Sequence, residues 1–86
     1  MDLKDMEGLI YSEVVKAEGK FPHWHKDIIH AAAVLCEESG ELLQACINYH
    51  FGRGTIDEVE KEMAHTGAMV YRFGLHLENY KPREKK

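Results

Sequence analysis

Four side chains that can ligate a metal ion occur as two pairs in the sequence. Glu38 and Glu41 form the first pair, and Glu62 and His65 form the second. Residues three positions apart on an α-helix lie on the same face, about one turn along the axis, so each pair can direct both side chains at one point. Carboxylates grouped in this way repel one another unless a cation neutralises them. The two pairs therefore predict a metal site between two helices, as in the core of a helical bundle.

The residues that follow these glutamates favour a metal site over an ordinary exposed surface. An exposed helix commonly carries a lysine four positions after a glutamate, where the two side chains attract each other. Ala45 and Thr66 stand at those positions after Glu41 and Glu62, and neither is basic. Oxygen ligands suit a hard divalent cation such as Mg²⁺. A solvated acidic face is the alternative interpretation of Glu38, Glu41 and Glu62.

Periodic apolar residues predict two helices in the first part of the chain. From Asp2 to about Lys20 they recur every three or four positions, which is typical of an amphipathic helix that ends before Pro22. From Lys26 to about Tyr49 no proline interrupts the chain, and the apolar surface is broader than one partner helix would cover. The second helix should therefore be the central one.

A third helix is expected from Thr55 to about Glu78. Thr55 and Glu58 have the spacing of a capping box, in which each side chain accepts a hydrogen bond from the backbone of the other residue. The connections are short, so the second and third helices should pack antiparallel. The predicted fold class is all-α, an antiparallel bundle of about three helices, with a single helical domain at 1–80 and a flexible charged tail at 81–86.

Two glycines and two cysteines inside these helices carry further expectations. Gly40 and Gly67 each cost up to about 1 kcal/mol relative to alanine in a helix interior. Close approach of two helix backbones beside the acidic residues would compensate for that cost, and simple tolerance is the alternative. Cys36 and Cys46 lie about 15 Å apart along one helix, too far for a disulfide, and are predicted to be buried thiols.

Length and composition limit the class of protein. A chain of 86 residues forms one domain at most and buries only about 60% of its unfolded surface, which favours a homodimer or homotetramer. The net charge of −4 argues against nucleic-acid binding. No apolar run approaches the ~20 residues that span a bilayer, and the first residues lack the pattern of a signal peptide, so no membrane partner and a cytoplasmic location are expected. No Gly-rich phosphate loop or catalytic Ser/His/Asp or Cys/His arrangement is visible.

Two motifs in the chain resemble those of a known enzyme family. Glu37-Glu38-Ser39-Gly40-Glu41-Leu42 and the later Glu62-Met63-Ala64-His65 are similar to the paired motif of the MazG-like, all-α nucleoside triphosphate pyrophosphohydrolases. In that family a Glu-x-x-Glu on one helix and a Glu-x-x-Asp on the next bind Mg²⁺, which activates water and orients the triphosphate. The resemblance covers roughly residues 28–77. It implies a nucleotide substrate, with a nucleoside monophosphate and pyrophosphate as products.

The resemblance also assigns roles to individual residues. It implies that Glu38, Glu41 and Glu62 hold the metal, with Glu37 or Glu38 as the carboxylate that accepts a proton from water. His65 stands where the family has aspartate. An imidazole ligates a metal in its neutral form and favours Mn²⁺ more than aspartate does. Either the metal preference has changed from Mg²⁺ or catalysis is reduced or lost.

Substrate contacts and alternative functions complete the expectations. Arg72 lies on the ligand face of the third helix and could contact a phosphate, unless it only complements the helix dipole. Lys26 and Arg53 are further candidate phosphate ligands, and Trp24 is a candidate base-stacking residue unless it packs on the core.

A phosphoribosyl-ATP pyrophosphohydrolase of the same superfamily is one alternative function. A non-catalytic helical oligomer that keeps the scaffold as a binding module is another.

Overall fold

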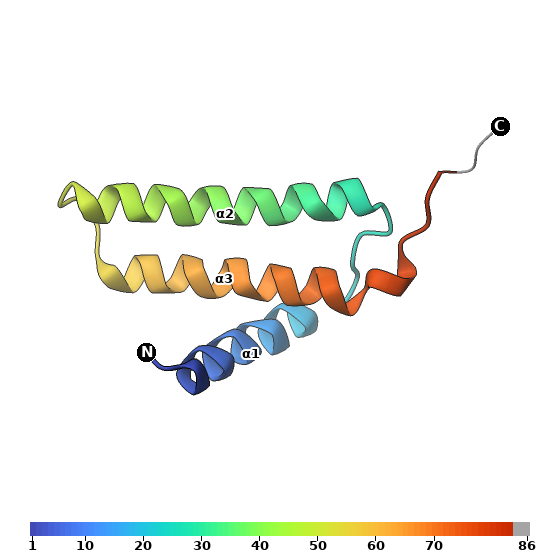
Figure 1. The fold of residues 1–86 in the computed structure, drawn as a ribbon, viewed down its shortest axis with the longest axis horizontal. Helices are drawn as coiled ribbons and strands as arrows, with labels where there is room; N and C mark the ends of the chain where they lie inside the picture. Colours follow the sequence, from blue (N-terminus) through green and yellow to red (C-terminus); the bar gives the residue numbers. More distant parts are fainter. Residues whose placement is uncertain (84–86) are drawn as a thin grey trace.

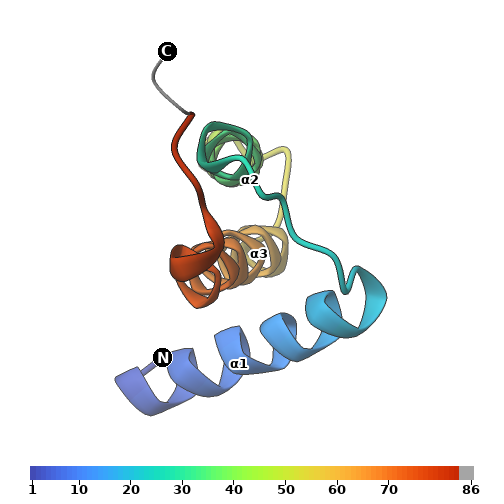
Figure 2. The same cartoon turned by 90° about the vertical axis from the view of Figure 1, so that its right-hand side faces the viewer.

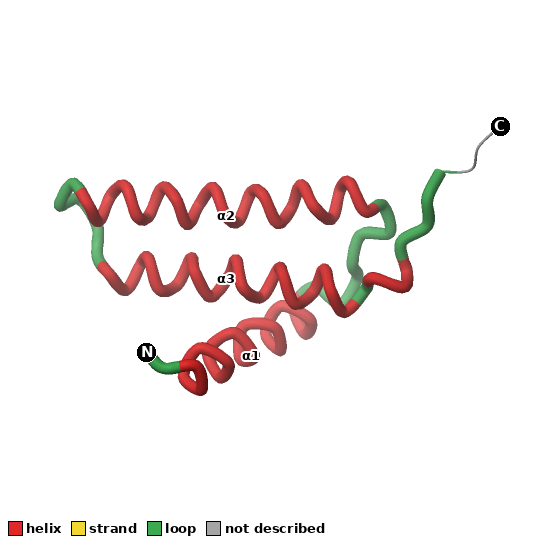
Figure 3. Tube along the Cα trace, in the orientation of Figure 1, coloured by secondary structure: helices red, strands yellow, loops and turns green. Residues whose placement is uncertain are grey.

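The computed structural model of this chain describes residues 1–83 and is entirely helical in its regular structure over that range (Figures 1 and 3). It contains α1 (Leu3–Lys20), α2 (Ile28–His50) and α3 (Ile56–Leu75), followed by the short 3-10 helix η1 (Leu77–Asn79). Helices α2 and α3 run antiparallel, and α1 crosses α3 on the side that faces away from α2 (Figure 2). The prediction of an all-α fold with three helices is confirmed.

Side-chain caps start the first and third helices at the predicted places. The Asp2 carboxylate accepts a hydrogen bond from the Asp5 backbone at 2.8 Å, and the Asp5 carboxylate accepts one from the Asp2 backbone at 3.2 Å, which completes a capping box. At α3 the Thr55 hydroxyl accepts a hydrogen bond from the Glu58 backbone at 3.2 Å. Within the described residues, the Glu58 carboxylate accepts no hydrogen bond from the backbone N–H of Thr55, so this capping box is only half formed. The Glu58 carboxylate lies beside Gly54 instead.

The last helix ends earlier than its apolar pattern predicts. Helix α3 stops at Leu75 rather than near Glu78, and the chain continues as η1. The backbone N–H of His76 donates to the carbonyl of Phe73 at 3.4 Å, three residues back rather than four. This tightens the last turn toward 3-10 geometry. Periodicity alone does not distinguish the two helix types over one turn.

Small side chains form the buried core. Among the described residues, the buried apolar side chains are those of Val14, Ala31, Ala45, Ala64 and Ala68. Alanine lets helix axes approach closely because it places only a methyl group in the contact. Many large apolar side chains lie outside this core. Ile29 on α2, for example, is 78% exposed. The three helices therefore leave much of their apolar surface uncovered.

The two helix-interior glycines have different surroundings. A Cβ on Gly67 would lie 2.8 Å from Cδ1 of Ile10, whereas a Cβ on Gly40 would meet nothing within 4 Å. The prediction that both glycines allow two helix backbones to approach was therefore wrong. Gly67 makes room for an α1 side chain, and Gly40 lies on an open surface.

The two cysteines are free thiols, as predicted, but they are exposed rather than buried. Helix α2 turns Ala31 and Ala45 toward α3, and Cys36 falls on the opposite side of the helix by the geometry of 100° per residue. Cys46 also lies outside the inward-facing positions. The prediction of burial was wrong because the outer face of α2, although apolar, is not covered by another helix of the described chain.

The chain after α3 folds back onto the helices as far as Tyr80. Its hydroxyl accepts a hydrogen bond from Nε1 of Trp24 at 2.6 Å and donates one to the carbonyl of Phe73 at 3.2 Å. Of the predicted charged tail, residues 81–83 are exposed and 84–86 lie outside the described residues. Within the described residues no helix combines the length and apolarity needed to cross a membrane.

The glycine environments predict opposite effects of the same substitution. Gly67→Ala should lower the free energy of unfolding by about 1 kcal/mol, because overpacking costs about 1–3 kcal/mol and the gain in helix propensity offsets only part of it. Gly40→Ala, the matched control, should raise it by up to about 1 kcal/mol. Urea denaturation measures both. In an Ile10→Ala background, Gly67→Ala should no longer destabilise, and a persisting loss there would show that Ile10 is not the obstacle.

Candidate metal centre

Three of the four predicted ligands come together between α2 and α3. Glu38 extends from α2, and Glu62 and His65 extend from α3. One ligand atom from each residue lies within 4.8 Å of the other two. Nδ1 of His65 is 3.8 Å from Oε2 of Glu62. All three side chains are partly buried, so the cluster is neither a solvated face nor a sealed core.

Thr66 fixes the two helix backbones beside the cluster. Its hydroxyl is 3.1 Å from the backbone carbonyl of Glu38 and 2.9 Å from that of Glu62. The second contact is within α3, but the first joins α3 to α2 next to a ligand residue. Ala31 and Ala45, which lie on the same face of α2 as Glu38, are buried against α3 on either side of this contact. The carboxylates are therefore brought together by backbone packing.

Two carboxylate oxygens of the cluster lack hydrogen-bond partners within residues 1–83, and the carboxylates repel one another. Burial raises the pKa of Glu38 above its ordinary value, and the nearby Glu41 and Glu62 carboxylates raise it further, while His65 acts in the opposite direction. Oε2 of Glu38 and Oε2 of Glu62 are both buried without a hydrogen-bond partner among the described residues. A buried carboxylate oxygen without a partner is unfavourable. A bound cation would relieve both the repulsion and the missing contacts.

The spacing of the cluster is close to what a divalent ion requires. Octahedral coordination at about 2.1 Å separates adjacent ligands by about 3 Å and opposite ligands by about 4 Å. The ligand atoms here lie up to 4.8 Å apart, so side-chain shifts on the order of 1 Å would close them on an ion. Two carboxylates and one imidazole fit Mn²⁺ well, and carboxylates with water also suit Mg²⁺.

The other two predicted carboxylates lie outside this cluster. Glu41 is exposed, yet its carboxylate is close enough to raise the pKa of Glu38 through repulsion. It also lines, with Glu62, a neighbouring cavity of about 350 Å³. Glu37 is exposed and lines neither of the two cavities that contain Glu38. Of the two candidate proton acceptors, the structure brings only Glu38 to the cluster.

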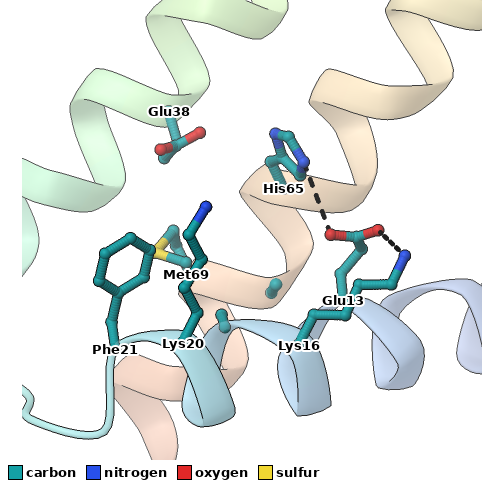
Figure 4. A pocket seen from close by; sticks show the side chains of 9 residues that line it. Glu13, Lys16, Lys20, Phe21, Glu38, His65 and Met69 are labelled. Atoms are coloured by element: carbon teal, nitrogen blue, oxygen red, sulfur yellow. Dashed lines mark hydrogen bonds and ion pairs between the residues drawn. The ribbon is translucent and has the colours of Figure 1, made fainter.

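A cavity of about 330 Å³ opens beside the cluster, between α1 and the α2–α3 pair. Glu38 and His65 line one side of it, and Lys16 and Lys20 of α1 line another. Figure 4 shows the Lys20 side chain extending from α1 toward Glu38. The cavity thus combines metal-ligating groups with two ammonium groups, a combination that suits an anion bound through a metal.

The α1 residues of this cavity were missed by sequence reasoning. Glu13, Lys16 and Lys20 recur at spacings of three and four, so they share one face of the first helix. That pattern was visible in the sequence. Which neighbour the face meets depends on how α1 packs on α3, and no local pattern contains that information.

Arg72 and Trp24 pack against each other close to the cluster but are not part of it. The Arg72 side chain is buried, donates to the backbone carbonyl of Phe21 and to Glu18, and lies 4.7 Å over the Trp24 ring. Trp24 and Arg72 also line, with Glu38, a second cavity of about 300 Å³. Both cavities share Phe21, so they adjoin.

Lys26 and Arg53 are not brought to the cluster. Lys26 is exposed in the 21–27 connector before α2, and Arg53 lies in the α2–α3 loop over the ring of Phe51 at 5.5 Å. That loop is at one end of the helix pair, whereas the 21–27 connector is at the other (Figure 1). Neither residue lines a cavity that contains Glu38.

Comparison with known proteins gives no match: no family model, curated protein or solved structure matches this chain. The resemblance of its two acidic motifs to a family therefore stays a prediction from the residues themselves.

The raised pKa of Glu38 predicts a pH-dependent effect of neutralising it. The folded-state pKa lies above the ordinary value of 4.5, so Glu38 favours the fold in its protonated form, and this stability is lost as the pH rises through the folded-state pKa. In metal-free buffer Glu38→Gln should raise the Tm at neutral pH. This increase in Tm should vanish at about pH 4, where Glu38 of the parent chain is itself protonated. Thermal melts across this range, with Glu37→Gln as control, check it, and a gain that does not depend on pH would contradict it.

Proposed function

We propose that this chain is a metal-dependent nucleotide pyrophosphohydrolase of the MazG-like kind, which cleaves a nucleoside triphosphate to a monophosphate and pyrophosphate. One observation carries the proposal. Glu38, Glu62 and His65 converge from two antiparallel helices, and two of their carboxylate oxygens are buried without partners. This is the arrangement that the two sequence motifs predict for a bundle-core metal site.

The donor set supports Mg²⁺ or Mn²⁺ as the cofactor. A divalent ion supplies Lewis acidity and neutralises phosphate charge when bound. Glu38, Glu62 and His65 would hold it, with Glu41 able to approach from the next turn of α2. His65 shifts the preference toward Mn²⁺, because imidazole is a better ligand for transition metals than for Mg²⁺.

The chain's own residues account for the remaining requirements of phosphate hydrolysis. A general base has to lie within reach of the proton that it accepts, and Glu38 lines the cavity that opens beside the cluster. Lys16 and Lys20 line the same cavity and offer positive charge to phosphate oxygens. Phe21 lines this cavity and the adjoining one that contains Trp24, which leaves an aromatic surface for a base next to the phosphate region.

One observation favours a second candidate function. His65 replaces the aspartate of the family motif, so the cluster carries one negative charge fewer. A site weakened in this way is consistent with a helical oligomer that binds metal or nucleotide without turnover. Binding without product release would support this alternative. The phosphoribosyl-ATP pyrophosphohydrolase alternative differs only in substrate and is covered by the same assay.

We also propose that the chain functions as a homodimer or homotetramer through the outer face of α2. That face, opposite α3, carries large exposed apolar side chains at Ile29, Leu43 and Ile47. Exposed apolar patches of this kind on a small domain are typical of interaction surfaces. A second copy would present the same face, and a two-fold contact between identical patches is the commonest form of assembly.

The function is tested by a pyrophosphate-release screen over ribo- and deoxyribonucleoside triphosphates and phosphoribosyl-ATP, with Mg²⁺ and with Mn²⁺. At least one nucleotide should be turned over, and only with metal. Glu38→Gln and Glu62→Gln should each lower kcat by about 100-fold or more, because they remove a proton acceptor or a metal ligand.

Glu37→Gln is the matched control, since it neutralises an exposed carboxylate adjacent to Glu38 and should retain activity. Metal-dependent changes in Tm are followed in parallel. Metal binding without turnover of any nucleotide would favour the binding module. No metal-dependent change in Tm and no turnover would contradict the proposal.

Analytical ultracentrifugation at about 10 μM should find at least a dimer. Leu43→Asp places a charge on the outer face of α2 and should shift the chain to monomer, whereas Val15→Asp, at an exposed position of α1, serves as control. A parent chain that sediments as a monomer would overturn the assembly part of the proposal and leave the metal site untouched.

A further inference from the structure

The imidazole of His65 lies between carboxylates from two different helices. Its Nδ1 is 3.8 Å from Oε2 of Glu62 in the metal cluster, and its Nε2 is 3.5 Å from Oε2 of Glu13 on α1. Figure 4 shows Glu13 reaching from α1 to the His65 ring on the side away from Glu38. Glu13 is not one of the three residues whose ligand atoms converge. Its contact with the site runs through His65.

The two ring nitrogens have to play different roles if His65 binds a metal. A neutral imidazole carries one proton, so one nitrogen ligates and the other donates. Nδ1 faces the Glu62 oxygen that is buried without a partner, which makes it the ligating nitrogen. The proton then belongs on Nε2, which faces Glu13. A carboxylate that accepts from the second ring nitrogen is the usual support of a metal-bound histidine.

The Glu13 side chain is held in place for this role. Its other oxygen, Oε1, is 3.4 Å from Nζ of Lys16, one turn further along α1. The adjacent Val14 is buried, and Ile10 fits against Gly67 of α3. The packing of α1 on α3 therefore sets the distance between Glu13 and His65.

Charge gives a reason for the pairing. Histidine in place of aspartate removes one negative charge from the ligand set, and Glu13 returns one on the far side of the imidazole. A carboxylate in that position makes the ring a stronger ligand.

We propose that Glu13 is a positioning residue that fixes the Nε2–H tautomer of His65 and strengthens it as a metal ligand, so that α1 completes a centre otherwise built from α2 and α3. This inference rests on the metal site of the proposed function. It adds a third helix to that site and explains how a histidine can stand at the aspartate position.

The test is a set of Mn²⁺ titrations by calorimetry on the parent, Glu13→Gln, His65→Asp and the double variant, with Co²⁺ absorption spectra as a second readout. Glu13→Gln should weaken Mn²⁺ binding by about 10- to 100-fold and change the visible Co²⁺ spectrum of the parent site. In the His65→Asp background the same substitution should change the affinity by less than about twofold, because aspartate has no N–H for Glu13 to accept. Glu7→Gln, which neutralises an exposed glutamate on the same helix, should have no effect in either background.

The outcomes separate this inference from the proposed function. Metal binding by the parent that is unchanged in Glu13→Gln overturns the inference alone. An equal loss in both backgrounds also overturns it, because Glu13 would then act on the metal directly and independently of His65. A parent chain that binds neither Mn²⁺ nor Co²⁺ overturns the metal site itself and the inference with it.

Discussion

The close contact between α2 and α3 is the constraint on which the candidate site depends. Ala31 and Ala45 of α2 line this contact, and the Thr66 hydroxyl reaches the backbone carbonyl of Glu38 on the other helix. The small side chains of α2 and the Thr66 contact allow the two helices to bring their carboxylates closer than electrostatic repulsion favours. Glu38 consequently has a raised pKa and an oxygen without a partner. The packing holds these side chains together without an ion, which is what a preorganised metal site would require.

The helical fold and the convergence of Glu38, Glu62 and His65 could be predicted from the sequence because both depend on local periodicity. Spacings of three and four residues fix which side chains share a helix face, and they correctly paired Glu62 with His65 and aligned Glu38 with them. They placed Glu41 in the cluster, although the structure leaves it at the exposed edge. A pair on one helix face spans about 60°, and the tilt of the partner helix decides which of its members points inward.

The contribution of α1 could not be predicted in the same way. The periodicity of the first helix shows that Glu13 and Lys16 share a face with Lys20, but not that this face meets His65. The expected burial of Cys36 failed for a related reason, since an apolar residue on a helix is buried only if something covers it. Both properties depend on contacts between helices distant in sequence or on a partner outside the chain.

The same small residues connect the candidate site to the exposed apolar surface. Alanines at the α2–α3 seam allow the ligands to converge, but each buries little apolar area, and burial of area is the main source of stability. Larger side chains such as Leu43 would stabilise the fold more, yet they fall on the outer face of α2, where this chain alone does not cover them. In a domain of 86 residues, a helix position can hold either a small side chain that allows close helix approach or a large one that buries more apolar area. A second copy on the outer face would supply the missing burial without widening the seam, so the geometry that favours a metal site also favours an oligomer.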